Sequence, residues 1–165
     1  MKYRMLFVFI EGDDDERFFH LILKPEFEKK YNTVKLWKYA QEEPDKTRKF
    51  LKSIEEMNKD MHVDYIYVSD IDLSPCISGK KEKIQDKIKN IDRDNIIVVI
   101  KEIESWYLAG LSNEDLKKLT RITMEHTDDI TKEQFDRLMS KKFTSRIDFM
   151  MELLKYFSID TAKQK

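Results

Sequence analysis

Glycine, proline and cysteine are scarce in this sequence of 165 residues, and each scarcity excludes a class of protein. Three glycines and three prolines argue against a disordered or low-complexity chain. A single cysteine, Cys76, excludes a disulfide framework and a multi-cysteine zinc site. No apolar run approaches the ~18 residues that a membrane-spanning helix needs. We therefore expect a folded protein with no membrane partner.

The apolar stretch at residues 5–10 resembles a secretory signal only superficially. It is short, it runs straight into Glu11 and the aspartates at 13–15, and no small-residue cleavage site follows it. We interpret this stretch as a buried strand and expect the protein to be cytoplasmic.

An excess of charge of one sign is also lacking. The 31 Lys and Arg residues face 32 Asp and Glu residues, which gives a formal net charge of −1. A basic field over the whole domain, as nucleic-acid-binding domains often have, is therefore absent. A local strip of basic residues could still bind nucleic acid. The alternative interpretation is that these residues form a solvated helix face. These residues are Lys80, Lys81, Lys83, Lys87 and Lys89.

Short apolar runs alternate with segments of helical periodicity through most of the chain. The runs predict strands at 5–10, 33–39, 65–68 and 95–100. Helical periodicity predicts helices at 15–31, from Pro44 onward, at 80–91 and at 103–110. This alternation predicts an α/β domain over residues 1–110, with a mostly parallel four-stranded sheet flanked by helices. Residues 111–165 read as a helical C-terminal extension packed on the same domain.

Acidic residues follow three of these predicted strands. Glu11 follows the first strand, Asp70 and Asp72 follow the third, and Glu104 lies just past the fourth. Parallel strands end at one edge of a sheet, and neighbouring strands are ~4.8 Å apart. Carboxylates gathered at ~6 Å repel by roughly 3 kcal/mol per pair at an effective dielectric of ~20, so a proton or a cation is expected among them. Solvated turn residues are the alternative.

Oxygen ligands of this kind suit a hard divalent ion, Mg²⁺ above all, with Mn²⁺ as a substitute. Such an ion is usually shared with substrate phosphates, which indicates metal-assisted transfer or hydrolysis at a phosphoester. Lys80 and Lys101 are the candidate lysines for binding a substrate phosphate. The alternative interpretation of Lys80 is a solvated residue at the start of a helix.

Three segments resemble the Toprim domain of topoisomerases, bacterial primases and overcoming-lysogeny-defect nucleases. Residues 7–16 read FVFIEGDDDE, a buried strand that ends in Glu-Gly with an Asp three residues after the Gly. Residues 65–72 read YIYVSDID, a buried strand that ends in Asp-x-Asp. Residues 103–110 read IESWYLAG, which is similar to a segment of small stand-alone Toprim-like proteins, some of them linked to mobile elements and phage defence.

The resemblance implies a Toprim-like, Rossmann-like fold and a role for each matched acid. Glu11 would be a general acid/base or a metal ligand, and Asp70 and Asp72 would bind Mg²⁺. Asp15 would help to position the metal or cap the first helix, and Glu104 would be an extra acid beside the site. The resemblance leaves open whether this chain cuts or joins anything, and whether its partner is DNA, RNA or a nucleotide.

Two other functions remain open. Asp70 and Asp72 could form the nucleophile and acid pair of a haloacid-dehalogenase-like phosphotransferase, although such a pair normally follows the first strand and is followed by Thr or Val, where this chain has Leu73. The chain could instead be a non-catalytic effector module that binds nucleic acid, a nucleotide or an operon-encoded protein partner. Balanced charge favours the second of these.

Overall fold

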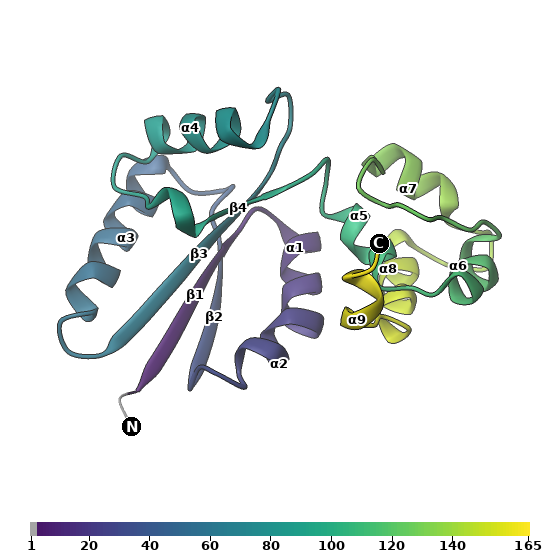
Figure 1. Ribbon diagram of the computed structural model, residues 1–165, viewed down its shortest axis with the longest axis horizontal. Helices are drawn as coiled ribbons and strands as arrows, with labels where there is room; N and C mark the ends of the chain where they lie inside the picture. Colours follow the sequence, from purple (N-terminus) through teal and green to yellow (C-terminus); the bar gives the residue numbers. More distant parts are fainter. Residues whose placement is uncertain (1–2) are drawn as a thin grey trace. The chain divides into compact units, whose positions relative to one another are not determined.

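The computed structural model describes residues 3–165 (Figure 1), which divide into two compact units. The first unit extends to Val99 and the second runs from Ile100 to Lys165. The helix α5 (Glu104–Ala109) contacts α7, α8 and α9 of the second unit, and the expected domain boundary after residue 110 stays a prediction. Among residues 3–165, no helix is both long enough and apolar enough to cross a membrane.

The first unit is built on a parallel four-stranded sheet, as predicted. The strand order is β2-β1-β3-β4, and every pair of neighbours is parallel. The strands are β1 (Arg4–Ile10), β2 (Thr33–Lys38), β3 (His62–Asp70) and β4 (Ile96–Val99). β1 therefore lies inside the sheet, which explains why Leu6 to Ile10 are all buried without the polar alternation of a half-exposed strand.

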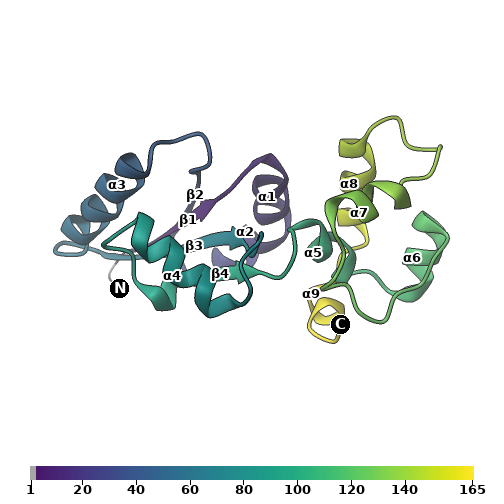
Figure 2. The same ribbon diagram turned by 90° about the horizontal axis from the view of Figure 1, so that it is seen from above.

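Helices cover both faces of this sheet (Figures 1 and 2). The helices α3 (Pro44–Met57) and α4 (Ile77–Lys87) lie on one face, and α1 (Asp13–Phe18) and α2 (Lys24–Phe27) lie on the other. The core on the α3–α4 side joins alternate strand residues such as Phe9 and Tyr67 to Leu51 of α3 and Ile84 of α4. The Rossmann-like layering expected from the sequence is confirmed.

The predicted helix 15–31 is divided into three parts. A five-residue π-helix, η1 (Phe19–Leu23), separates α1 from α2. Pro25 lies in the first turn of α2, where its missing N–H and its ring disrupt the regular hydrogen bonds of the preceding turn. A short 3₁₀ turn, η2 (Arg93–Asn95), leads into β4.

The second unit is entirely helical. After α5 come α6 (Asn113–Thr120), α7 (Lys132–Leu138), α8 (Arg146–Lys155) and α9 (Ile159–Ala162). Buried aromatic rings join three of these helices, since the Phe135 ring lies 6.1 Å from that of Tyr107 and 5.2 Å from that of Phe149. Thr131 caps α7 in a capping box, since its side chain accepts a hydrogen bond from the backbone N–H of Gln134.

Candidate active site at the carboxyl edge of the sheet

The first and third strands end at the same edge of the sheet. The register pairs Phe9 of β1 with Tyr67 of β3 in parallel, and β1 ends one residue before Glu11. Asp70 is the last residue of β3, because that strand is longer than the predicted 65–68. The structure therefore brings Glu11 and Asp70 to one edge of the sheet, as the sequence predicts.

Glu11 lines a cavity of about 200 Å³ between this edge and α4. Its Oε2 atom is buried and accepts no hydrogen bond from any described residue. The remaining lining residues are Tyr39, Tyr67, Ser69, Asp72, Lys80, Lys83, Ile84, Lys87 and Ile88. A second cavity of about 200 Å³ shares Glu11, Tyr39 and Lys87, so the hollow continues toward the first turn of α3. A buried carboxylate oxygen without a donor is unusual, and a cation or a proton donor would satisfy it.

Asp72 enters this cavity by a turn after β3. Its backbone has a φ of 49°, in the left-handed region that aspartate tolerates better than most residues. Its carboxylate forms an ion pair with the ammonium group of Lys80, in the first turn of α4. The Lys80 side chain is only 11% exposed, whereas that of Asp72 is 59% exposed. Lys80 therefore meets the carboxylate at the mouth of the cavity, not in bulk water.

Asp70 lies on the other side of the sheet edge. Successive side chains of a strand point to opposite faces. Tyr67 and Ser69 line the cavity, so the alternation along β3 turns Asp70 toward the α1 face. Within residues 3–165, no group of three or more His, Cys, Asp or Glu side chains is arranged to hold a metal ion. The ligand roles of Glu11, Asp70 and Asp72 stay predictions.

Asp15 caps the first helix. Its Oδ2 atom accepts a hydrogen bond from the backbone N–H of Gly12 at 3.1 Å, and the residue is buried. A carboxylate in the first turn of a helix also interacts favourably with the helix dipole. These contacts support the capping role that was one of the two expected for Asp15, and the other, on the metal side, stays a prediction.

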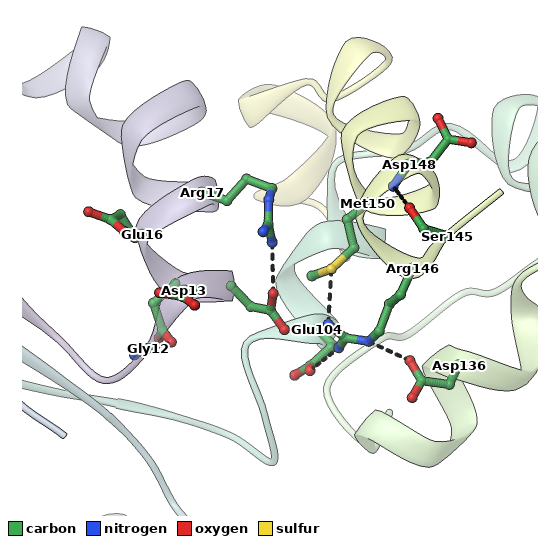
Figure 3. A network of polar contacts seen from close by, with 12 residues as sticks. Gly12, Asp13, Glu16, Arg17, Glu104, Asp136, Ser145, Arg146, Asp148 and Met150 are labelled. Carbon is green, nitrogen blue, oxygen red and sulfur yellow. Dashed lines mark hydrogen bonds and ion pairs between the residues drawn. The ribbon is translucent and has the colours of Figure 1, made fainter. Parts of the chain in front are cut away.

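Glu104 belongs to a polar network of the second unit (Figure 3). Its carboxylate accepts a hydrogen bond from Nη2 of Arg146 at 2.5 Å. Nε of Arg146 donates to Asp136 at 2.7 Å, and Nη1 lies 3.2 Å from the sulfur of Met150. Arg146 thus already neutralises Glu104, whose metal role stays a prediction. Lys101 is exposed, with a φ of 62°, and its contact with phosphate also stays a prediction.

Two tyrosines contribute to the cavity that sequence reasoning did not single out. The Tyr39 hydroxyl donates to the carbonyl of Val68 at 2.7 Å, and its ring stacks on that of Tyr67 with centroids 4.3 Å apart. Burial raises the pKa of Tyr39 well above 10 and, to a lesser degree, the pKa of Tyr67. Both phenols are therefore neutral at pH 7 and add no negative charge to the lining.

The lysines at 80, 83 and 87 all line the cavity. Their spacing of three and four residues was the available signal, because residues so spaced share one face of a helix. The first turn of α4 contains no acidic residue, so its backbone N–H groups add to the positive potential beside Lys80.

A divalent ion fits part of this site. The unpartnered, buried Oε2 atom of Glu11 offers a ligand oxygen, and carboxylates are the donors that Mg²⁺ prefers. Asp72 offers a second carboxylate on the same cavity, but Lys80 holds it. The donor set therefore suits Mg²⁺ at Glu11 directly, and at Asp72 once Lys80 has moved away.

No family model matches the sequence, and no curated protein matches it either. The structure is similar to that of the C-terminal region of the Burkholderia pseudomallei OLD protein, with a TM-score of 0.51 and 14% identity over 98% of this chain and 91% of that chain. The C-terminal region of the Xanthomonas campestris pv. campestris OLD protein gives a TM-score of 0.42 and 16% identity over 98% and 81%. The first likeness confirms the Toprim-like fold expected from the motifs.

Proposed function

We propose that the first unit carries out divalent-metal-dependent phosphoester chemistry on nucleic acid or a nucleotide, as a Toprim-like nuclease or nucleotidyl transferase. One observation carries this proposal. Glu11, whose Oε2 atom is buried and unpartnered, lines a cavity that three lysines of α4 also line. Positive side chains can bind a phosphate group, and a carboxylate that lacks a hydrogen-bond donor can bind a cation. A cavity that has both can therefore bind the two together.

Each lining group then has a role. Lys80, Lys83 and Lys87 bind phosphate oxygens, and the neutral hydroxyl of Tyr39 maintains the cavity wall through its bond to Val68. On the cavity side Asp72 would hold the ion, and Glu11 would be a second ligand or the group that moves a proton. Asp70 would contribute from the other side of the sheet edge. Bound Mg²⁺ or Mn²⁺ would neutralise the phosphate oxygens and the leaving alkoxide.

A second candidate is a non-catalytic module that binds an anionic partner at the same cavity. The ion pair between Lys80 and Asp72 favours it, because a lysine already neutralises one of the predicted metal ligands. This candidate keeps the phosphate-binding role of the lysines and drops the chemical step.

The test is a cleavage assay with the full chain. Single-stranded DNA, double-stranded DNA and RNA are incubated with 5 mM Mg²⁺ or Mn²⁺, on the order of the millimolar concentrations used for weakly held ions. Wild-type protein is expected to cleave at least one of them. Glu11→Gln should slow cleavage by ~10²–10⁴-fold, as expected for loss of a proton-transfer group.

Asp86→Asn is the matched control for charge. Asp86 lies on the same helix as the three lysines, but its side chain is 85% exposed and it is absent from the cavity lining. Its variant should cleave at the wild-type rate. Binding of an oligonucleotide without cleavage under any of these conditions would reject the enzyme and favour the binding module.

A further inference from the structure

The ion pair between Lys80 and Asp72 places a lysine where the proposed function requires a metal ion. The ammonium group of Lys80 pairs with the Asp72 carboxylate, which could otherwise be a ligand of the ion. Lys80 lines the same cavity as Glu11, whose oxygen lacks a donor. One carboxylate of the cavity is therefore neutralised from within the chain and the other is not.

The two partners of this pair differ in how easily each can leave it. The carboxylate of Asp72 is more than half exposed on a turn, so water can solvate it when the pair opens. The side chain of Lys80 is nearly enclosed, and leaving its ammonium group without an anion would carry a desolvation cost. Asp72 can therefore exchange its partner, provided that another anion reaches Lys80.

The cavity provides for such an anion. Lys83 and Lys87 line it beside Lys80, and both are exposed. Lys83 already contacts the Ser74 hydroxyl at 3.2 Å, which positions its ammonium group near the turn that carries Asp72. A phosphate group that entered along these lysines would reach Lys80 from the solvent side.

We propose that phosphate and divalent metal bind to this cavity cooperatively, because Lys80 passes from Asp72 to the phosphate and so releases Asp72 to the metal. The proposal rests on the proposed function, since it takes Asp72 as a metal ligand. Lys80 then prevents the ion from binding firmly before the phosphate group has arrived, and binds that phosphate when it does. Thermodynamic linkage requires the effect to be reciprocal, so that metal also tightens the binding of phosphate by the same factor.

The test measures Mn²⁺ binding to the full chain by electron paramagnetic resonance of the free ion, with and without inorganic phosphate. A protein-free sample at each phosphate concentration corrects for Mn²⁺ bound by phosphate itself. Saturating phosphate should tighten Mn²⁺ binding to wild-type protein by at least ~5-fold, the lower end of usual coupling factors. Lys80→Met should bind Mn²⁺ more tightly than wild type without phosphate and lose the response to phosphate.

Lys89→Met is the matched control, because Lys89 is an exposed lysine a short way beyond the end of α4 and is not part of the lining. It should behave as wild type. Lys80→Gln, a polar uncharged replacement, gives the same expectation if the apolar Lys80→Met fails to fold, and a thermal melt of each variant verifies folding.

The outcomes separate the two proposals. Equal Mn²⁺ binding by wild type and both Lys80 variants, with no effect of phosphate, would overturn the exchange and leave the metal site in place. Absence of Mn²⁺ binding from all proteins, with or without phosphate, would overturn the proposed function as well.

The source of the phosphate is distinguished by two further probes. Adenosine monophosphate and a single-stranded ten-nucleotide DNA both present a phosphate group to Lys80. A nucleic acid strand would also engage the lysines further along α4, so Lys83→Met and Lys87→Met should weaken the DNA several-fold more than the mononucleotide. Equal weakening of both probes would assign the site to a nucleotide.

Discussion

The ion pair of Glu104 and Arg146 is enclosed on one side only. The Glu104 side chain is 5% exposed, whereas that of Arg146 is 26% exposed and also binds Asp136. Replacing Glu104 with alanine removes the partner that neutralises the inner end of the guanidinium. We expect Glu104→Ala to lower the free energy of unfolding by ~3 kcal/mol, at the lower end for a buried pair because Asp136 remains. Urea unfolding followed by circular dichroism measures the change.

Asp136→Ala is the comparison that isolates burial. Asp136 binds the same guanidinium, but its side chain is 44% exposed, so its loss should cost less than about 1 kcal/mol. Equal losses from the two variants would show that burial of Glu104 does not dominate the network.

The sequence predicted acidic residues of the site but not their pairing with the basic residues that neutralise them, Arg146 and Lys80. Glu104 was predicted as an acid beside the site because it follows a strand, but its partner Arg146 lies 42 residues further along the chain, and no spacing rule connects them. Asp72 was predicted as a ligand from its motif, and the side chain of Lys80 as a phosphate contact. That the two neutralise each other follows from the turn between β3 and α4, which brings Asp72 and Lys80 together and whose path no spacing rule predicts.

At the scale of elements, Gly110 fixes the end of α5 against the C-terminal segment. A Cβ atom at this position would lie 2.4 Å from ring atoms of Phe157, while the Gly110 carbonyl accepts a hydrogen bond from Ser158 at 2.9 Å. This backbone bond holds the segment of Phe157 close to Gly110, so an added methyl group would force the ring to rotate or the backbone to shift. We expect Gly110→Ala to lower the free energy of unfolding by about 1–3 kcal/mol, as overpacked substitutions do, and urea unfolding measures it.

Gly79 serves as the opposite case. It lies in the first turn of α4, and a Cβ atom there would approach Cys76 at 3.6 Å, an ordinary contact. Because alanine loses less conformational freedom than glycine when a helix forms, Gly79→Ala should raise the free energy of unfolding by up to ~1 kcal/mol. Destabilisation by both variants alike would contradict the steric argument for Gly110.

The elements were predicted best where a strand carries its own pattern of continuous or alternating apolar residues. The predicted ranges for β1, β2 and β4 lie within one residue of the observed ends, because each strand carries its own hydrophobic signal. β3 begins three residues earlier than predicted, since its polar start pairs with β1, where His62 lies opposite Arg4. α4 also begins three residues early, because the Cys76 sulfur caps it by accepting from the N–H of Gly79 at 3.4 Å, and cysteine is not a usual capping residue.

At the scale of the whole molecule, the division at Val99 carries no sequence signal. With three glycines and three prolines in the chain, no flexible segment marks a linker, so the boundary was set where the strand pattern ended. The α5 residues Tyr107 and Leu108 are fully buried, and α5 contacts the helices that follow it. Packing partners, which a sequence pattern does not reveal, therefore assign α5 to the second unit.

Net charge likewise conceals the arrangement that matters. The chain is balanced overall, yet α4 presents Lys80, Lys83 and Lys87 to the cavity. Glu82 and Asp86, which interrupt the lysine run in the sequence, are exposed and are not part of this lining. The helical period thus separates the charges that the linear sequence intermixes, and a balanced chain acquires a local positive surface.

Metal binding at this edge of the sheet should stabilise the protein in a way that can be localised. An ion at 100 times its dissociation constant adds ~2.7 kcal/mol to the free energy of unfolding. For a chain of this size, that corresponds to a rise in Tm of roughly 5–10 °C. Scanning calorimetry at a fixed, saturating phosphate concentration, in the presence and absence of saturating Mg²⁺, measures the rise, and Asp72→Asn should abolish most of it.

Hydrogen exchange then shows where the stabilisation acts. Glu11, Asp70 and Asp72 all belong to the unit that ends at Val99, so Mg²⁺ should slow exchange most in peptides that cover residues 9–15 and 67–80. Peptides from Ile100 onward contain none of the three carboxylates and provide the internal comparison. Because a non-specific ionic effect would slow exchange across acidic surface segments generally, uniform protection over both units, or a rise in Tm that survives in Asp72→Asn, would contradict binding of the ion at the carboxyl edge of β1 and β3.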